Sequence, residues 1–171
     1  MTVSDPTTRA AEMAAWHAHT TAHAHLAAHL ARDLAARTGL SEADHVVLDA
    51  LLDEPDGRMR ALRLRWALQW EKSRLSHQVA RMAKRGLLVR ESCPEDGRGW
   101  DIALTEPGRE AARRARHVRE EAVRTLVLDT LGPERLAGLA ATAALLTRAL
   151  TAAADADAAC RAARAAALAD E

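Results

Sequence analysis

Residues 7–37 contain neither Gly nor Pro, and this long stretch without a helix breaker constrains the fold more than any other feature of the sequence. Such a stretch predicts one long helix that ends at Gly39. At 100° per residue, one face of this helix carries an aromatic, His and Leu stripe that comprises Trp16, His19, His23, Leu26, Leu30 and Leu34.

The composition extends this prediction to the whole chain. It has no Phe, no Tyr and few β-branched residues, while Ala, Leu, Arg and Glu are abundant, which favours a mainly helical protein and excludes β-sandwiches and barrels. A length of 171 residues suits one domain.

Location is predicted from cysteine and apolar patterns. Cys93 and Cys160 stand far apart and form neither a metal-binding pair nor a disulfide framework, as expected in a reducing cytoplasm. We find no export signal and expect no apolar run near the roughly 18 to 20 residues that span a bilayer, so no membrane partner is expected.

Charge is strongly segregated although the chain is neutral overall. Residues 58–90 hold ten Arg or Lys and a single acidic residue, Glu71, so the remainder is correspondingly acidic. A basic block of this kind predicts that one face meets a polyanion.

The basic block reads as a helix-turn-helix. Ser41 with Asp44 three residues later gives a capping signal for a helix that stops at 55–57. A short basic helix is predicted over 59–67, and the joint Leu68-Gln69-Trp70 connects it to a further helix over 71–86.

A change of hydrophobic period after Gly86 predicts a two-stranded wing. Residues 87–91 and 100–104 read as strands around the turn-rich segment 94–99. At the expected tip, Asp96 and Arg98 lie two residues apart, so the carboxylate would hold the guanidinium extended toward a narrow minor groove; an ordinary surface hairpin is the equal alternative.

Two helices are expected after the wing. Thr105 caps the first, and Gly132-Pro133 closes it. The second begins near Glu134 and continues into an Ala-rich tail that is either helical or frayed. Its apolar positions follow the steps of three and four of a helix seeking a partner helix: Leu136, Leu139, Ala143, Leu146 and Leu150.

The helix over 71–86 is the strongest candidate for DNA recognition. Leu75, Val79 and Met82 form its inner face, and no carboxylate follows Glu71 on the outer face. Arg, Gln and Ser side chains donate to base edges and phosphates. The predicted outer, DNA-binding residues are Lys72, Ser73, Arg74, Ser76, His77, Gln78 and Arg81.

The sequence resembles the MarR family of winged helix-turn-helix regulators, through residues 71–78, Arg85-Gly86-Leu87-Leu88 and the wing pattern of Asp96, Arg98, Leu104 and Thr105. The resemblance extends loosely over 41–150. It implies a homodimer joined by its terminal helices, a palindromic operator, and a small-molecule or redox signal that weakens DNA binding. It also implies that 72–81 enter the major groove and Arg98 the minor groove. Gln69 departs from the pattern, because a Gly is common at this joint.

The His-rich first helix leaves three interpretations open. His19 and His23, like His25 and His29, have the i, i+4 spacing of a metal-chelating pair. His19 and His23 share a face with Trp16. The resemblance to the MarR family implies that these three side chains instead pack at the dimer interface or line a pocket for an aromatic or acidic effector.

Cys93, the Trp residues and the other polar groups give weaker indications of function. Cys93 would make the wing redox-sensitive, but an ordinary cysteine is favoured. The Trp side chains, including those of Trp66 and Trp70, are expected to pack in the hydrophobic core as wedges between helices. No combination of residues indicates catalysis, a resident metal or a cofactor.

We therefore expect a mainly α fold: six helices with a two-stranded β wing, a winged helix-turn-helix between long N- and C-terminal dimerisation helices. Residues 1–40 form the N-terminal helix and a candidate pocket wall, 41–105 the DNA-binding region, 106–150 the C-terminal dimerisation helices and 151–171 the tail. The expected function is a cytoplasmic, homodimeric, DNA-binding transcriptional repressor released by a small molecule. The alternatives are a metal-responsive helical protein and an oligomeric interaction adaptor.

Overall fold

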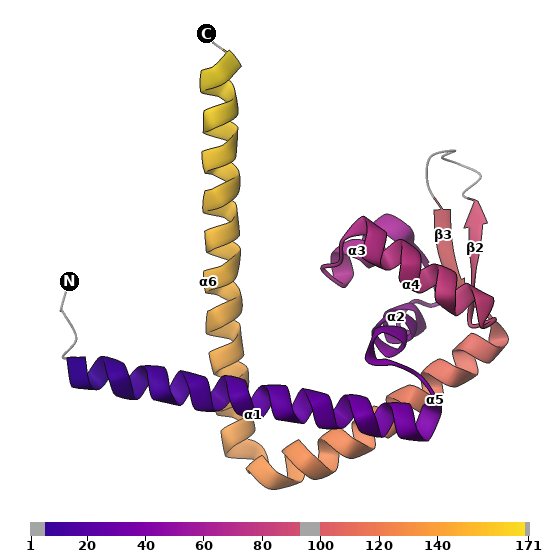
Figure 1. Cartoon of the computed structure of the whole chain (residues 1–171), viewed down its shortest axis with the longest axis horizontal. Coiled ribbons are helices and arrows are strands. Elements are labelled where there is room, and N and C mark those ends of the chain that lie inside the picture. Colours follow the sequence, from indigo (N-terminus) through magenta and orange to yellow (C-terminus); the bar gives the residue numbers. More distant parts are fainter. Residues whose placement is uncertain (1–5, 93–99, 170–171) are drawn as a thin grey trace. The chain divides into compact units, whose positions relative to one another are not determined.

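The computed structural model describes residues 6–92 and 100–169. Two compact units make up the chain, Met1–Val123 and Arg124–Glu171, and each is described by itself. In chain order (Figure 1), the first unit contains α1 (Pro6–Thr38), α2 (Glu42–Leu52), β1 (Arg58–Arg60), α3 (Ala61–Ala67), α4 (Lys72–Lys84), β2 (Leu88–Ser92), β3 (Trp100–Leu104) and α5 (Glu106–Val123). The second unit contains the π-helical turn η1 (Arg124–Leu128) and α6 (Asp129–Ala169).

Helix α1 confirms the prediction of one long N-terminal helix. It ends where Gly39 adopts φ +70° and donates its backbone N–H to the carbonyl of Ala35 at 2.9 Å. Only the C-terminal end is covered, since Leu34 is fully buried and α1 contacts α5, whereas Trp16 keeps 48% of its surface exposed. The N-terminal part of the stripe is therefore largely exposed.

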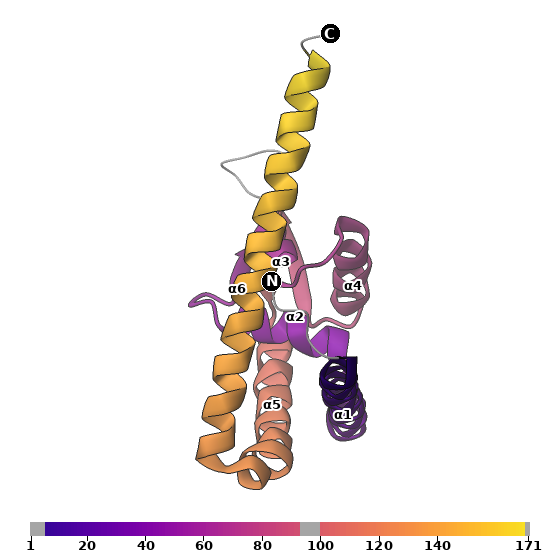
Figure 2. The same ribbon diagram turned by 90° about the vertical axis from the view of Figure 1, so that its left-hand side faces the viewer.

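Helix α2 lies at the centre of the first unit, between α4 and α5 (Figures 1 and 2). Its start confirms the capping signal, because the Ser41 hydroxyl accepts from the Asp44 backbone and the Asp44 carboxylate accepts from the Ser41 backbone. The largest fully buried side chains around it form the hydrophobic core, and they are Leu34, Val47, Leu48, Leu51, Leu64, Val79, Met82, Leu88 and Ile102.

The joint between α3 and α4 confirms the helix-turn-helix. Gln69 has φ +52°, the left-handed conformation that Gly adopts without strain. The turn is closed by the Trp70 backbone N–H, which donates to the carbonyl of Arg65 at 3.0 Å. Gln69 stands where MarR family sequences commonly have Gly. The structure shows that this position has the left-handed backbone conformation that favours Gly.

The sheet confirms the two predicted wing strands as β2 and β3, and it contains a third strand that the sequence analysis did not predict. It has three antiparallel strands in the order β1-β3-β2, because residues 58–60 pair with 101–103. Of these, 59 and 60 were predicted to begin a helix over 59–67. Met59 is buried in the core and pairs with Ile102. A strand of three residues is too short to show a period in sequence, and its partner lies some forty residues away.

The start of α5 is tied closely to the end of α4. The Thr105 hydroxyl donates to the carbonyl of Gly86 at 2.6 Å and accepts from the backbone of Gly108 at 3.0 Å. A Cβ on Gly108 would lie 1.7 Å from the carbonyl oxygen of Leu87, so only Gly allows this approach. The strands β2 and β3 and the helix α4 are thereby held to α5.

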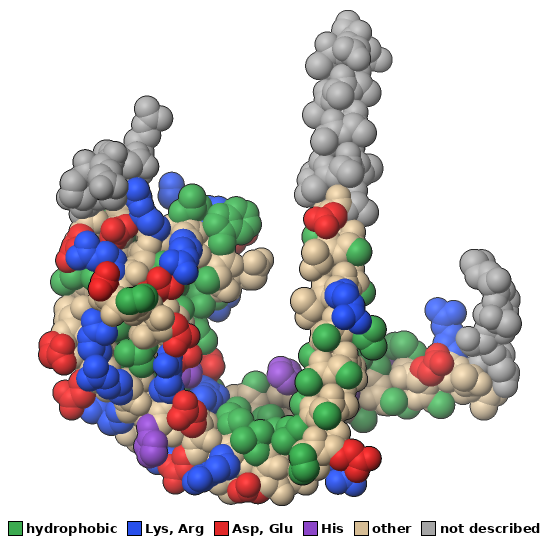
Figure 3. Space-filling view, turned by 180° about the vertical axis from the view of Figure 1, so that it is seen from behind, with side chains coloured by type: hydrophobic (Ala, Val, Ile, Leu, Met, Phe, Trp, Pro, Cys, Tyr) green, Lys and Arg blue, Asp and Glu red, His purple; other side chains and the backbone are tan. Residues whose placement is uncertain are grey.

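The second unit is a helix with an exposed apolar surface. Gly132, with φ +70° and ψ +170°, breaks the helix before Pro133, as the sequence predicts. Beyond this kink, Leu139, Leu146 and Leu150 remain 44%, 45% and 71% exposed. Figure 3 shows apolar side chains over the visible face of the described part of α6.

The expectation that no apolar run is long enough to span a bilayer is wrong. The helical stretch Glu106–Asp155 includes a window of mean hydropathy 1.5, none of it buried, that is long and apolar enough to cross a bilayer. The run was missed because its apolar content is mostly Ala and Leu interrupted by a few polar residues. Length and composition do not distinguish a membrane span from a helix that packs on a partner.

Candidate nucleic-acid interface

Helix α4 has one buried and one cationic face, as predicted. Leu75, Val79 and Met82 are buried in the core. The structure places five predicted DNA-binding residues in exposed positions and leaves Ser76 partly buried; the five are Lys72, Ser73, Arg74, His77 and Arg81. No acidic residue lies within α4. The helix therefore presents an uncompensated positive surface.

Gln78 is not on that surface, and its predicted outward position is wrong. Its side chain is only 3% exposed, and its amide nitrogen donates to Oδ1 of Asp44 at 2.7 Å. The amide oxygen accepts from the guanidinium of Arg81. The sequence spacing indicates this inward position, because Gln78 follows Leu75 by three residues and precedes Met82 by four, as residues on one helix face do.

Asp44 is the centre of this buried polar network. Its Oδ2 accepts from the Ser41 backbone and hydroxyl, both at 2.9 Å, and from Nη1 of Arg85 at 2.7 Å. Arg85 also donates to the carbonyl of Gly39 at 3.2 Å. The network links the middle of α4 and the residue that follows its C-terminal end to the corner between α1 and α2.

The protonation of Asp44 follows from these contacts. Burial opposes the charged form, but the hydrogen bonds from Ser41 and Arg85 outweigh it and hold the pKa of Asp44 below its ordinary value. The carboxylate is therefore ionised at neutral pH and acts only as an acceptor.

Three Trp rings of the first unit stack against arginines. The guanidinium carbons of Arg65, Arg74 and Arg90 lie 4.9, 4.2 and 4.4 Å from the ring centroids of Trp66, Trp70 and Trp100, respectively.

These contacts change the expectation that the Trp residues are core wedges. Trp70 and Trp100 pack partly buried against the core. Trp66, however, is 61% exposed and Trp16 is 48% exposed, so the expectation is wrong for these two. Arg90 additionally donates to the carbonyl of Ser76 at 2.8 Å, which joins the wing strand β2 to α4.

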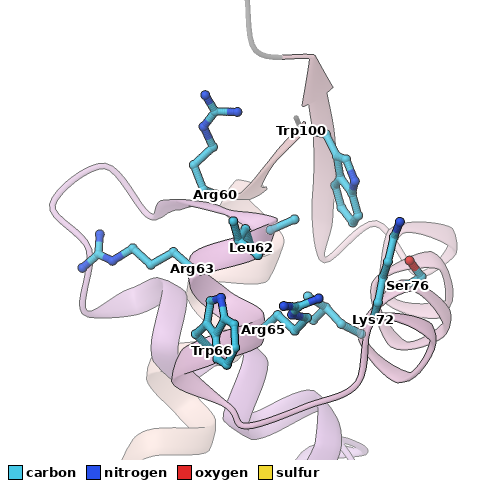
Figure 4. Close-up of a pocket in the computed structure, with 10 residues that line it drawn as sticks. Arg60, Leu62, Arg63, Arg65, Trp66, Lys72, Ser76 and Trp100 are labelled. Atoms are coloured by element: carbon cyan, nitrogen blue, oxygen red, sulfur yellow. The ribbon is translucent and has the colours of Figure 1, made fainter. Parts of the chain in front are cut away.

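A cavity of about 770 Å³ opens between α3, α4 and β3 (Figure 4). Lys72 and Ser76 of α4 line one side, and Arg65 and Trp66 of α3 line another, with Trp100 above them. The lining contains basic side chains and indole rings but no carboxylate.

The basic block of 58–90 divides into two groups. Arg58, Arg60, Arg63 and Arg85 form ion pairs with Glu91, Asp101, Glu54 and Asp44. No ion pair with a carboxylate is found, within the described residues, for the second group, which consists of Arg65, Lys72, Arg74, Arg81, Lys84 and Arg90. Four residues of this unpaired group lie on α4, one lies on α3 and one lies on β2.

Comparison with known proteins identifies this arrangement. A family model described as MarR family matches residues 38–99. A DNA-bound structure of Sco3205, a MarR family transcriptional regulator from Streptomyces coelicolor, is 35% identical with a TM-score of 0.76, over 81% of this chain and 86% of that one. AbsC, another MarR family transcriptional regulator from Streptomyces coelicolor, is 33% identical with a TM-score of 0.77, over 88% and 98%. The chain belongs to the MarR family.

MarR family regulators are DNA-binding transcription factors and not enzymes, and this chain is a winged-helix regulator of that type. The fold also matches a mutant MarR from E. coli complexed with operator DNA, at 16% identity and a TM-score of 0.65, over 84% of this chain and 99% of that one. No curated protein matches the chain significantly. These relatives do not favour the metal-responsive or adaptor alternatives.

The wing residues assigned by the MarR resemblance cannot be placed in this geometry. Asp96, Arg98 and Cys93 lie outside the described residues. The strands that lead to and from them are described, with Ser92 paired to Trp100. Their roles stay predictions.

The structure brings Trp16, His19 and His23 together on one exposed face of α1. The Trp16 and His19 ring centroids are 5.9 Å apart, and those of His19 and His23 are 6.5 Å apart. No group of three or more His, Cys, Asp or Glu side chains that could hold a metal is found in the described part of the chain. Trp16, His19 and His23 therefore form a row of exposed rings on the surface of α1.

Sequence reasoning missed the role of Asp44 beyond capping, the contacts of Arg85 and the stacking partner of Arg74. Asp44 was identified as a cap because its partner Ser41 is three residues away. Its contact with Gln78 spans 34 residues and has no local signature.

Proposed function

We propose that this MarR family chain acts in the cytoplasm as a homodimeric repressor that binds a pseudo-palindromic operator. Each subunit inserts α4 into one of two successive major grooves about one helical turn apart. The observation that carries the proposal is the outer face of α4, which is cationic and has no carboxylate partners among the described residues. A surface of one sign is costly in self-repulsion unless a polyanion neutralises it.

The roles along α4 follow from side-chain chemistry. Arg74 is the candidate for bidentate contact with guanine, and Lys72 and Ser73, at the start of the helix, are candidates for phosphate contacts. His77 and Arg81 continue the same surface, and Ser76 faces the cavity with Lys72. Because its side chain is buried, we propose no base contact for Gln78.

Arg98 extends the interface into the minor groove, supported by Asp96. Replacing Arg98 with Ala is expected to lower the slope of log affinity against log salt by about one unit per subunit, because one phosphate-neutralising charge is lost. Fluorescence anisotropy between low and moderate salt measures that slope. An unchanged slope contradicts a DNA contact by the wing.

Dimerisation is proposed through α1 and α6. Met13 and Trp16 on α1, and Leu145 and Leu146 on α6, are 45–60% exposed in the single chain. Their apolar surface favours burial against a second copy. This packing accounts for the apolar window of the C-terminal helix without a membrane. Sedimentation equilibrium in detergent-free buffer is expected to give twice the chain mass; a monomer contradicts this part.

We propose that Trp16, His19 and His23 border the dimer interface and form the wall of an effector site. An indole and two imidazoles suit a planar aromatic or acidic ligand. Candidate effectors are those whose addition releases DNA from the wild type but not from a Trp16→Ala, His19→Ala double variant. Equal release from both proteins assigns the effector to another part of the chain.

Operator binding is tested directly by genomic pull-down. Purified full-length protein captures sheared genomic fragments, and the recovered motif is expected to show two half-sites related by two-fold symmetry. Fluorescence anisotropy on the best fragment then measures specific against random-sequence affinity. Failure to bind any duplex at low salt contradicts the proposal.

A further inference from the structure

Two outward-facing arginines of α4 stand on the same stripe of the helix. Arg74 and Arg81 are seven residues apart, which places them two turns apart on one side of α4 at a separation of about 10 Å along the axis. Both are exposed, and neither forms an ion pair with a carboxylate among the residues that the structure describes. Each is nevertheless held by a neutral side chain.

Arg74 is held by the ring of Trp70. The guanidinium carbon lies 4.2 Å from the ring centroid. The ring itself is anchored, because Trp70 packs against the core and its backbone donates to Arg65 in the closed turn. A rigid ring under a guanidinium restricts the side chain and leaves its outer N–H groups free for DNA.

Arg81 is held by the amide oxygen of Gln78. That amide has only one orientation that satisfies its surroundings, since the Asp44 carboxylate accepts and does not donate. The amide nitrogen must face Asp44, so the oxygen must face Arg81. Asp44 is fixed in turn by Ser41 and Arg85.

We propose that Trp70 and Gln78 are positioning residues that order the Arg74 and Arg81 guanidinium groups toward DNA before DNA binds. This inference rests on the proposed DNA-binding role of α4. An arginine that is already ordered loses less side-chain freedom on binding, so the partner's contribution appears as DNA affinity. The same argument gives Gln78 a role in recognition although its side chain is buried.

Double-variant cycles on full-length protein test the coupling. Trp70→Leu alone is expected to weaken binding of the pulled-down operator about two- to fivefold, and Gln78→Met about tenfold. In Arg74→Ala and Arg81→Ala backgrounds, the respective partner change is expected to have less than about a twofold further effect. Trp70→Phe, which keeps an aromatic face, should retain most of the wild-type affinity.

Two controls separate positioning from general loss of structure. Trp66→Leu removes a ring that stacks on Arg65 of α3, and it should show no coupling to Arg74. Circular dichroism and urea titration establish that each variant is folded at the assay temperature. Equal effects of Trp70→Leu and Gln78→Met in the parent and Arg-deleted backgrounds overturn the proposal.

A measurement without DNA distinguishes this inference from the proposed function. Nitrogen-15 relaxation of the arginine Nε groups in the free protein is expected to show ordered Arg74 and Arg81, each mobilised only by loss of its own partner. Mobile groups in the wild type overturn the inference even when operator binding is intact. Ordered groups in a protein that binds no duplex overturn the proposed function and leave the ordering itself established.

Discussion

Arginines on α5 and on α4 lie in different surroundings. On α5, Arg116 donates to the carboxylates of Asp49 and Asp53 at 2.6 and 2.7 Å, and Arg119 pairs with Glu42. On α4, Arg74 and Arg81 contact an indole and an amide instead.

The difference shows how this chain divides its positive charge. An arginine paired with carboxylates joins helices within the fold and has little remaining attraction for a polyanion. An arginine held by a neutral partner keeps its full charge and most of its donors available. The paired arginines of α5 are structural, and the unpaired arginines of α4 lie on the proposed DNA surface.

The largest expected effect comes from removal of Asp44, the carboxylate that accepts from Gln78 of α4 and from Arg85 just after it. Asp44→Ala leaves Gln78 and Arg85 without their acceptor and is expected to lower the free energy of unfolding by about 2–3 kcal/mol. Urea denaturation at pH 7 measures this loss. Asp56→Ala, at an exposed position, is the matched control and should change stability by less than about 0.5 kcal/mol.

The dependence of the free energy of unfolding on pH in the acid range provides a second test of Asp44. Because the pKa of Asp44 is lowered in the folded chain, its stabilising contribution is present above its unfolded value of about 3.9 and is lost as pH falls through the folded value. Asp44→Asn is therefore expected to flatten the decline of stability below about pH 4. A decline of unchanged steepness contradicts the assigned role.

Replacing Arg74 sharpens the comparison from the DNA side. Arg74→Ala is expected to cost about 1–3 kcal/mol of affinity for the specific site, with a smaller loss on random DNA, because a base-reading group is removed. Stability should hardly change, since no carboxylate partner of Arg74 is found among the described residues. Equal losses on operator and random duplexes remove its base-reading role.

Arg116→Ala is the counterpart on the paired side. It breaks two ion pairs, with Asp49 and Asp53, and a hydrogen bond to the Asp49 carbonyl. These contacts are partly exposed and screened by solvent, so the expected loss is about 1 kcal/mol of unfolding free energy. Operator affinity should stay within about twofold of the wild type. A large loss of DNA binding in a folded Arg116→Ala protein would blur the division between the two surfaces.

The smallest expected effect concerns the joint that aims α4. Gln69→Gly removes the strain of a left-handed non-glycine residue but makes the unfolded chain more flexible, so we expect a net gain of about 0.5 kcal/mol in stability. Thermal unfolding measures the gain. A destabilised variant would mean that the hydrogen bond from the Gln69 side chain to the carbonyl of Trp66, 2.9 Å long, outweighs the strain.

Much of the fold was predictable because its signals are local. The breaker-free stretch predicted α1, the Ser41–Asp44 spacing predicted the cap of α2, and the positions of Leu75, Val79 and Met82 predicted the inner face of α4. Short β1 and the buried Gln78 were missed, since each depends on a partner far away in the chain.

The sequence by itself determined the helices, the joint, the family and the excess of basic residues, because spacing along one segment is enough to define an amphipathic face or a turn. Only the tertiary structure decided which arginines are neutralised and which stay available. That choice depends on which carboxylate, ring or amide the fold brings within a few ångströms of each guanidinium, and such distances join residues that have no regular separation along the chain.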